Sequence, residues 1–259
     1  MKASYHRYDL QFKRPSGTSR GILNVKETWF IIIEKDGKKG IGECGLLRGL
    51  SIDDRPDYEE KLNWVCQNIT LGETALWEAM REFPSIQFGI EMVFLSVKSV
   101  NPFLLFPSEF TKGLKNIPIN GLVWMGTPDY MLEQIQSKIK EGFSCIKLKI
   151  GAINFKEEIK LIDYIRQHIP PEKMEIRVDA NGAFDSNDAL NKINQLFGYK
   201  IHSIEQPIAK NQYDSMAALC KDTPLPIALD EELIGIFDYK DFKAPEPFIP
   251  ESIGHHKEW

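Results

Sequence analysis

The sequence predicts an α/β protein in two parts, an α+β domain over residues 1–112 and a βα array over residues 113–259. From about residue 117, short apolar runs alternate with segments of helical periodicity. Such alternation predicts a parallel sheet whose crossovers are right-handed. The first hundred residues lack this alternation, because their strand-like runs come first and their helix-like runs follow.

The N-terminal part is expected to contain a hairpin followed by helices. Residues 25–34 are rich in β-branched and aromatic side chains, Asp36-Gly37 supplies a turn, and residues 38–43 have the pattern of a returning strand. Three helical stretches are predicted near residues 56–69, 73–83 and 85–99.

The second part is expected to hold five strands separated by helices. The predicted strands are residues 117–124, 145–149, 175–179, 202–205 and 227–230. Helices are predicted to start at the caps Thr127, Asn154 and Ser186, and a weaker one is predicted near residues 214–221.

The composition limits the classes of protein to which this chain can belong. The net charge of −5 gives no electrostatic reason to expect nucleic acid as a partner. The four cysteines are scattered without a Cys-x-x-Cys pair, which is typical of reduced thiols in the cytoplasm. The sequence shows neither a signal-peptide core nor an apolar run of membrane-spanning length, so we expect a cytoplasmic protein without a membrane partner.

Two lysines, Lys147 and Lys149, lie inside an apolar run. Because they are two positions apart, their side chains point to the same face of a strand. Such a pair is usually a solvated sheet edge or loop, but this run lies between two helix patterns, where a central strand is expected. Burial and mutual repulsion would both lower a lysine pKa, which suits a general base that works near neutral pH.

Three carboxylates follow the lysine pair at similar intervals. Lys149, Asp179, Glu205 and Asp230 are separated by 30, 26 and 25 residues, each about one βα unit. Each carboxylate ends a predicted strand, and in βα barrels the carboxyl ends of the strands carry the active site. One such acid alone is usually a helix cap or a surface residue, but three together require a cation. Oxygen ligands favour a hard ion, so we predict Mg²⁺, with Mn²⁺ as the alternative.

A lysine base beside a divalent ion predicts a reaction class. The ion takes up charge while a carboxylate substrate loses its α-proton and becomes an enediolate, and the lysine carries the proton. The sequence therefore predicts an enzyme with a small-molecule carboxylate as its substrate. Asn181 is a candidate hydrogen-bond donor to a ligating carboxylate.

These motifs resemble the enolase superfamily, in its muconate-cycloisomerase-like branch. The matching stretches are Lys147-Leu-Lys149, Asp179-Ala-Asn181, Glu205-Gln-Pro207 and Asp230-Glu-Glu232. The resemblance covers about residues 1–235 and implies a capping domain followed by a TIM-type barrel. It implies that Lys149 is the acid/base lysine and that Lys147 helps to set its pKa. The implied metal ligands are Asp179, Glu205 and Asp230, with Asn181 and Glu231 hydrogen-bonded behind them.

Within that branch the chain looks most like the o-succinylbenzoate synthase family of menaquinone biosynthesis. The local matches lie in residues 18–23, 42–51, 119–126 and 228–235. This resemblance implies a carbon–oxygen lyase that dehydrates a cyclohexadiene carboxylate to an aromatic ring. The implied substrate-loop residues are Ser19, Arg20, Gly21, Arg48 and Ser51. Dipeptide epimerases, N-acylamino acid racemases and cycloisomerases share the metal motifs and remain alternatives.

The family pattern is not met after Asp230. Only 29 residues follow it, whereas three further βα units need about 75–90 residues. The resemblance implies a second active-site lysine. The candidates are Lys240, Lys243 and Lys257, in a stretch with several prolines, and none of them is assigned a catalytic role. We therefore expect an incomplete barrel with about five strands, an irregular tail from about residue 241, and weak or no activity. A non-catalytic fragment is the alternative.

Overall fold

The computed structural model describes residues 1–18 and 21–236 of the chain. It divides into two compact units, Met1–Ile117 and Pro118–Trp259. Each unit has its own cluster of buried apolar side chains. The division lies in the connecting segment, a few residues after the boundary expected from the sequence.

The described residues of the N-terminal unit form one antiparallel sheet with the strand order β1-β2-β3. Its strands are β1 (Lys2–Thr18), β2 (Gly21–Lys35) and β3 (Lys38–Cys44). The predicted hairpin is confirmed: Lys35 pairs with Lys38, and Asp36 and Gly37 between them both have positive φ. Strand β1 was not predicted, because most of its described side chains are exposed and its sequence has little apolar alternation.

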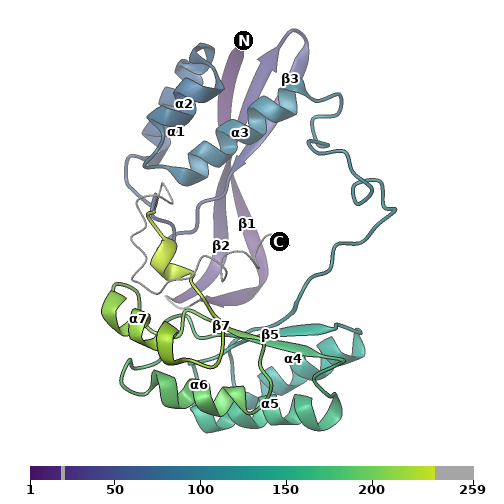
Figure 1. Cartoon of the computed structure of the whole chain (residues 1–259). Helices are drawn as coiled ribbons and strands as arrows, with labels where there is room; N and C mark the ends of the chain where they lie inside the picture. The colour runs from purple at the N-terminus through teal and green to yellow at the C-terminus, as the bar shows by residue number, and fades with distance from the viewer. Residues whose placement is uncertain (19–20, 237–259) are drawn as a thin grey trace. The chain divides into compact units, whose positions relative to one another are not determined.

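Helices cover this sheet, as the sequence predicted (Figure 1). They are α1 (Tyr58–Gln67), α2 (Glu73–Ala79) and α3 (Pro84–Lys98), with a short 3₁₀ turn η1 (Ile69–Leu71). A Cβ atom on Gly42 would collide with the backbone of Gly89, so glycines allow α3 to approach β3 closely. Trp29 and Ile31 of β2 are fully buried in the hydrophobic core of the N-terminal unit.

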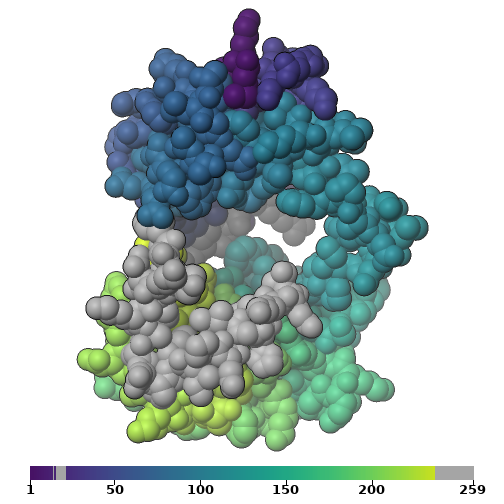
Figure 2. All heavy atoms as spheres, turned by 45° about the horizontal axis from the view of Figure 1, so that its top comes forward, coloured from purple at the N-terminus to yellow at the C-terminus, as the bar shows by residue number. Residues whose placement is uncertain are grey.

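The segment that connects the two units has many exposed apolar side chains. Its atoms lie on the surface in teal in Figure 2. The exposed side chains are Val100, Phe103, Phe106, Phe110, Leu114, Ile117 and Ile119.

In its described part, the C-terminal unit is a five-stranded parallel sheet in which each strand neighbours the next along the chain. The strands are β4 (Gly121–Val123), β5 (Cys145–Lys149), β6 (Glu175–Asp179), β7 (Ser203–Glu205) and β8 (Ile227–Ala228). The elements between and after them are α4 (Pro128–Lys140), α5 (Phe155–His168), α6 (Ala189–Phe197), α7 (Tyr213–Asp222) and the 3₁₀ turn η2 (Glu231–Leu233). The predicted α+β part followed by a five-strand βα array is confirmed.

The two faces of this sheet differ in chemistry. Ile146, Leu148 and Ile176 are fully buried and belong to a core shared with the helices, which lie on one side of the sheet (Figure 1). Lys147 and Lys149 alternate with these apolar residues and therefore point to the opposite face. The period of two in the sequence thus places the charged residues together on the face away from the helices.

Helix starts follow the predicted caps in two cases. The Thr127 hydroxyl accepts a hydrogen bond from the backbone N–H of Tyr130, and the Asn154 side chain accepts one from Lys156. The third prediction is wrong, because α6 begins at Ala189 and not directly after Ser186. Asp185 instead holds a turn before the helix by accepting the backbone N–H of Asn187 at 2.8 Å.

Candidate active site

The sheet register brings three predicted site residues into one row. Lys149 on β5 pairs with Asp179 on β6, and Asp179 pairs with Glu205 on β7. Lys147 lies two residues before Lys149 on the same face of β5. Asp230 comes two residues after β8, so it lies beyond the regular sheet. The 25–30-residue spacing therefore does correspond to neighbouring strand ends.

The two lysines contact the carboxylates directly. Lys149 Nζ donates hydrogen bonds to Asp179 Oδ2 at 2.7 Å and to Asn181 Oδ1 at 2.9 Å. Lys147 Nζ donates to Glu205 Oε2 at 2.5 Å and lies 3.5 Å from Asp179 Oδ2. The Asp179 side chain is only 1% exposed, so its charge is stabilised mainly by these amino groups.

Asn181 connects the lysine to a further acid. It has a positive φ of 45°, and its backbone N–H donates to Asp179 Oδ1 at 3.1 Å. Its side-chain amide donates to Glu231 Oε1 at 3.1 Å, while its oxygen accepts from Lys149. Thus the side-chain amide of Asn181 reaches Glu231, and the expected bond to a candidate ligand comes from its backbone instead.

Negative charge exceeds positive charge in this cluster. Its described charged groups are the ammonium groups of Lys147 and Lys149 and the carboxylates of Asp179, Glu205, Asp230 and Glu231. Two positive charges thus face four negative ones when all are ionised. Arg177 on the same face adds no net charge, because it is ion-paired with Glu175 at 2.5 Å.

The pKa shifts show the electrostatic cost of this excess. Burial raises the pKa of Glu205, and the charges of Asp179 and Asp230 raise it further against the opposing effect of Lys147. Partial burial raises the pKa of Asp230, and the neighbouring charges of Glu231 and Asp179 add to the shift. An additional cation near these groups would therefore be stabilised by them.

The pKa expected for the lysine pair needs a correction at Lys147. Burial disfavours its charged form, as predicted, but the hydrogen bond to Glu205 and the charge of Asp179 outweigh this effect. The pKa of Lys147 is therefore raised. Repulsion between the two lysines is therefore outweighed by the carboxylates that face them.

The chemistry of the donor set fits a hard divalent cation. The carboxylates of Asp179, Glu205 and Asp230 supply only oxygen atoms. Together with Glu231 they give the cluster an excess of two negative charges over its two lysines, which matches the charge of such an ion. Within the described residues, however, the His, Cys, Asp and Glu side chains form no ready-made cage for a metal ion. The Lys147 amino group contacts both Asp179 and Glu205, so a cation of the protein itself lies between these two carboxylates.

Trp124 is a site residue that the sequence analysis missed. The Lys149 Nζ atom lies over its ring, 5.5 Å from the centroid. Gln134 of α4 holds the Trp124 backbone, with both its amide oxygen and its amide nitrogen at 3.0 Å. The signal available in the sequence was an aromatic residue at the end of the predicted first strand of the array.

Gln206 and Glu232 were missed as well. Gln206 follows Glu205 directly and is fully buried, and the Glu232 side chain is also buried. Gln206 accepts the backbone N–H groups of Asp230 and Glu232 and donates to the Glu232 side chain. A polar residue between a candidate ligand and a proline, as in Glu205-Gln206-Pro207, was the available signal.

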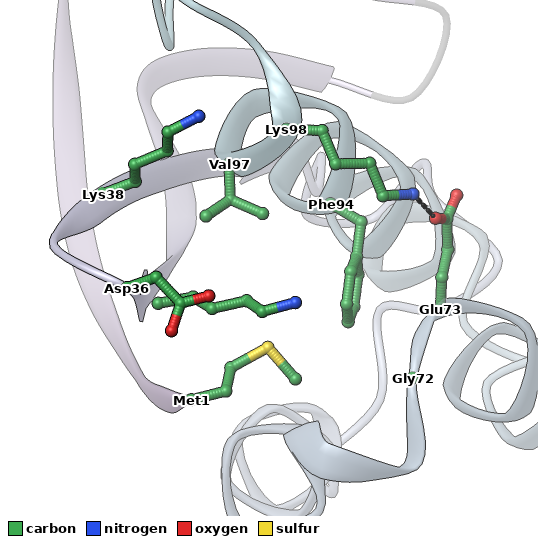
Figure 3. Close-up of a pocket in the computed structure, with 9 residues that line it drawn as sticks. Met1, Asp36, Lys38, Gly72, Glu73, Phe94, Val97 and Lys98 are labelled. Atoms are coloured by element: carbon green, nitrogen blue, oxygen red, sulfur yellow. Dashed lines mark hydrogen bonds and ion pairs between the residues drawn. The ribbon is translucent and has the colours of Figure 1, made fainter.

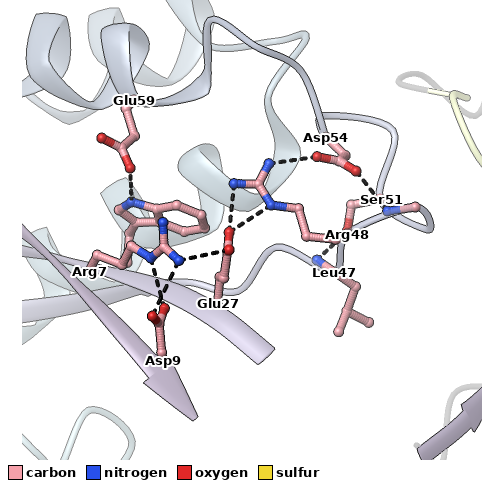
Figure 4. Close-up of polar contacts among 10 residues, drawn as sticks. Arg7, Asp9, Glu27, Leu47, Arg48, Ser51, Asp54 and Glu59 are labelled. Atoms are coloured by element: carbon pink, nitrogen blue, oxygen red, sulfur yellow. Dashed lines mark hydrogen bonds and ion pairs between the residues drawn. The ribbon is translucent and has the colours of Figure 1, made fainter. Parts of the chain in front are cut away.

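Two of the predicted substrate-loop residues, Arg48 and Ser51, hold their own loop together (Figure 4). The Arg48 guanidinium donates to Glu27 Oε2 and to Asp54 Oδ1, each at 2.7 Å. The Ser51 hydroxyl accepts the backbone N–H of Leu47 at 2.9 Å. Their role toward a substrate stays a prediction.

The remaining predicted loop residues are described only in part. Gly21 is the first residue of β2. Ser19 and Arg20 lie outside the described residues. The three candidates for a second active-site lysine, Lys240, Lys243 and Lys257, also lie outside them.

The N-terminal unit contains a cavity of about 490 Å³ beside the turn between β2 and β3 (Figure 3). Asp36 and Lys38 border it on one side, and Phe94 of α3 borders it on the other. Lys98 at its edge is ion-paired with Glu73 at 2.7 Å. This cavity does not contain any of the predicted site residues.

Comparisons with known proteins identify the family to which the chain is similar. A family model described as "Enolase C-terminal domain-like" matches residues 130–245. The o-succinylbenzoate synthase of Desulfotalea psychrophila is 42% identical over 267 residues, which cover 91% of this chain and 73% of that relative.

Solved structures show the same likeness. The crystal structure of MenC from Desulfotalea psychrophila has a TM-score of 0.76 at 38% identity, covering 91% of this chain and 72% of that one. The o-succinylbenzoate synthase structure from Thermosynechococcus elongatus, complexed with Mg in the active site, has a TM-score of 0.72 at 23% identity. It covers 89% of this chain and 68% of that one.

By its fold and its sequence the chain belongs to the enolase superfamily. Within this superfamily of enzymes it is one of the proteins that resemble o-succinylbenzoate synthase, a lyase. In the part of the chain that the structure describes, none of the helices has the length and apolar character needed to cross a membrane.

Proposed function

We propose that this protein is a Mg²⁺-dependent dehydratase of the o-succinylbenzoate synthase type, acting in menaquinone biosynthesis in the cytoplasm. The observation that carries the proposal is the cluster of four carboxylates and two lysines on one face of the parallel sheet and in the segment that follows β8. The 42% identity to o-succinylbenzoate synthase supports the choice of reaction within the superfamily.

Asp179, Glu205 and Asp230 would hold the divalent ion. Its two positive charges would oppose the burial and the neighbouring negative charges that raise the pKa values of Glu205 and Asp230. When bound, Mg²⁺ would stabilise the negative charge that develops on the substrate carboxylate. The Mg in the active site of the Thermosynechococcus elongatus structure supports Mg²⁺ as the ion, with Mn²⁺ as the alternative.

Lys149 would move the proton. As a neutral amine it removes the α-proton of the cyclohexadiene carboxylate, and the substrate becomes an enediolate. The resulting ammonium then gives a proton to the hydroxyl group as the carbon–oxygen bond breaks, so one water molecule leaves and the ring becomes aromatic. The amino group lies beside Asn181 Oδ1 and the Trp124 ring, which orient it.

The substrate loops are the third part of the proposal. Ser19–Gly21 and the loop with Arg48 and Ser51 would recognise the substrate. The folding of the second loop through the Arg48–Asp54 ion pair at 2.7 Å supports a defined rather than a loose contact surface.

The test is a turnover assay of this polypeptide with the hydroxylated cyclohexadiene carboxylate, with Mg²⁺ and then with a chelator. We expect Mg²⁺-dependent formation of the aromatic product, measured by its ultraviolet absorbance. Dipeptides and N-acylamino acids are assayed in parallel for exchange of the α-proton with solvent deuterium. Faster exchange on either of them would favour the epimerase or racemase alternative, and no turnover of any substrate would favour a non-catalytic chain.

A further inference from the structure

We infer that Gln206 positions Asp230 for metal binding, and that Glu232 holds Gln206 in the orientation that this task requires. The inference deepens the proposed function and rests on it, because it takes Asp230 as a ligand of the ion. It concerns residues for which the sequence motifs gave no role.

Asp230 needs an anchor that Asp179 and Glu205 do not need. Asp179 and Glu205 end regular strands whose backbones are hydrogen-bonded to their neighbours. Asp230 follows a strand of only two residues and has a backbone conformation outside the strand and helix regions, with φ −127° and ψ −80°. Its position therefore depends on contacts made by other elements.

Gln206 supplies that anchor from the neighbouring strand end. Its side-chain oxygen accepts the backbone N–H groups of Asp230 at 3.1 Å and of Glu232 at 3.2 Å. Its own backbone N–H donates to Ala228 O at 2.9 Å, so main chain and side chain hold the same segment. Because Gln206 follows Glu205 directly, it fixes one candidate ligand relative to the next.

Glu232 fixes which way the Gln206 amide points. The amide nitrogen of Gln206 donates to Ile208 O at 3.0 Å and to Glu232 Oε2 at 3.3 Å. The other carboxylate oxygen of Glu232 accepts the backbone N–H of Asn211 at 2.9 Å. A carboxylate can only accept hydrogen bonds, so it requires the nitrogen of Gln206 on its side and leaves the oxygen for Asp230.

Every polar atom of the Gln206 side chain makes hydrogen bonds. The residue is fully buried with a φ of 37°, a left-handed conformation that is uncommon for a residue with a side chain. A buried amide with both donors and its acceptor used twice is sensitive to any change of shape or charge. Partners that orient a metal ligand typically change metal affinity by about 10–100-fold when they are removed.

The first experiment compares two buried glutamines. Gln206→Met keeps the approximate length of the side chain and removes the hydrogen bonds. Gln87→Met is the matched control, because Gln87 is also buried and donates to Trp77 O at 3.0 Å in the N-terminal unit. Mg²⁺ affinity is measured by titration calorimetry, and exchange of the Asp230 and Glu232 amide protons is measured by NMR.

We expect Gln206→Met to weaken Mg²⁺ binding by about 10–100-fold and to accelerate exchange at these two amides. Gln87→Met should leave both quantities unchanged although it also lowers the melting temperature. A general loss of stability would instead affect the two variants alike.

A charge exchange tests the orientation and does not depend on whether Gln206→Met folds. Gln206→Glu places two carboxylates in contact and should weaken Mg²⁺ binding. Adding Glu232→Gln restores a donor between the two positions and keeps an acceptor for the Asn211 N–H, so the double variant should recover part of the affinity. Recovery is partial because Ile208 O still lacks its donor.

The outcomes separate the inference from the proposed function. If the unchanged chain does not bind Mg²⁺, the proposed function fails and the inference fails with it. If the unchanged chain and Gln206→Met bind Mg²⁺ equally, or if the double variant is weaker than Gln206→Glu alone, only the inference is overturned.

Discussion

Each of the two units contains a cluster of charged side chains. The surroundings shift the carboxylate pKa values in opposite directions in the two clusters. In the N-terminal unit, Arg48 joins Glu27 and Asp54, with side chains between 22% and 43% exposed. The backbone N–H of Gly49 and the charge of Arg48 lower the pKa of Asp54. In the C-terminal unit, burial and neighbouring carboxylates raise the pKa values of Glu205 and Asp230.

The difference distinguishes a cluster whose own residues stabilise its charges from one that a bound cation would stabilise. Asp54 is stabilised in its charged form by the groups around it, so its cluster needs no additional ion. Glu205 and Asp230 are destabilised in their charged form, so their cluster gains from a bound cation. Perturbed carboxylates at the ends of neighbouring strands are typical of functional sites.

The largest expected effect is on the chemical step. Lys149→Ala should reduce kcat by about 10²–10⁴-fold, because positioned proton transfer contributes that much to catalysis. Mg²⁺ affinity should not decrease, because the substitution removes a positive charge from the cluster. Initial rates and calorimetric titration measure the two quantities.

The control for this variant is Lys160→Ala. Lys160 lies on α5, is exposed, and pairs with Glu157 at 2.7 Å. It should retain the original kcat. A Lys149→Ala enzyme with nearly full activity would show that the lysine is not the proton carrier.

The next effect separates the two clusters directly. Asp230→Asn should weaken Mg²⁺ binding by roughly 100-fold or more, yet raise the melting temperature of the metal-free protein, because it removes a carboxylate whose pKa is raised. Asp54→Asn should do the reverse, with unchanged Mg²⁺ binding and a lower melting temperature, because the pKa of Asp54 is lowered. Thermal unfolding with and without Mg²⁺ measures both, and shifts of the same sign in the metal-free proteins would contradict the comparison.

A smaller effect concerns a buried acid outside both clusters. Glu158 is 1% exposed, and burial raises its pKa although the backbone N–H of Gly151 at 2.6 Å opposes the shift. A raised folded-state pKa gives stability that is present at low pH and is lost as the pH rises through that pKa.

Glu158→Gln removes this titration. The unfolding free energy of the variant relative to the original chain should therefore increase as the pH rises above the ordinary value of 4.5. Glu157→Gln, on the exposed face of the same helix, should show no such trend. Denaturant unfolding across this pH range gives the comparison, and parallel curves for the two variants would refute it.

The smallest effect on stability is expected in the N-terminal cluster. Arg48→Ala should lower the unfolding free energy by less than about 1 kcal/mol, because its ion pairs are partly exposed to solvent. If the loop contacts substrate as proposed, KM should increase several-fold while kcat stays the same. Arg55→Ala, which removes ion pairs to Asp57 and Glu82 in the same unit, should leave KM unchanged.

Much of the fold could be predicted because its signals are local. The hairpin turn at Asp36-Gly37 and the caps at Thr127 and Asn154 were read from two or three adjacent residues. The strand β1 was missed because its exposed residues lack apolar alternation, and the start of α6 was misplaced because Asp185 holds a turn before it.

The charged site was predictable as a set of residues but not as a set of contacts. Its members were found as charged residues at regularly spaced strand ends, whereas Trp124 and Gln206 carry no charge and Glu232 lies two residues after a candidate ligand. These three are recognised only through a ring over Lys149 and a buried amide that joins two turns.

By itself the sequence determined that Lys147 and Lys149 share a face and that Asp179, Glu205 and Asp230 follow successive strands. A period of two and a regular unit length are found by counting positions along the chain, so no knowledge of contacts in space is needed. Only the tertiary structure decided that carboxylates raise the pKa of Lys147 and that Gln206 anchors Asp230. Both depend on distances through space between residues that are 24 to 58 positions apart in the chain.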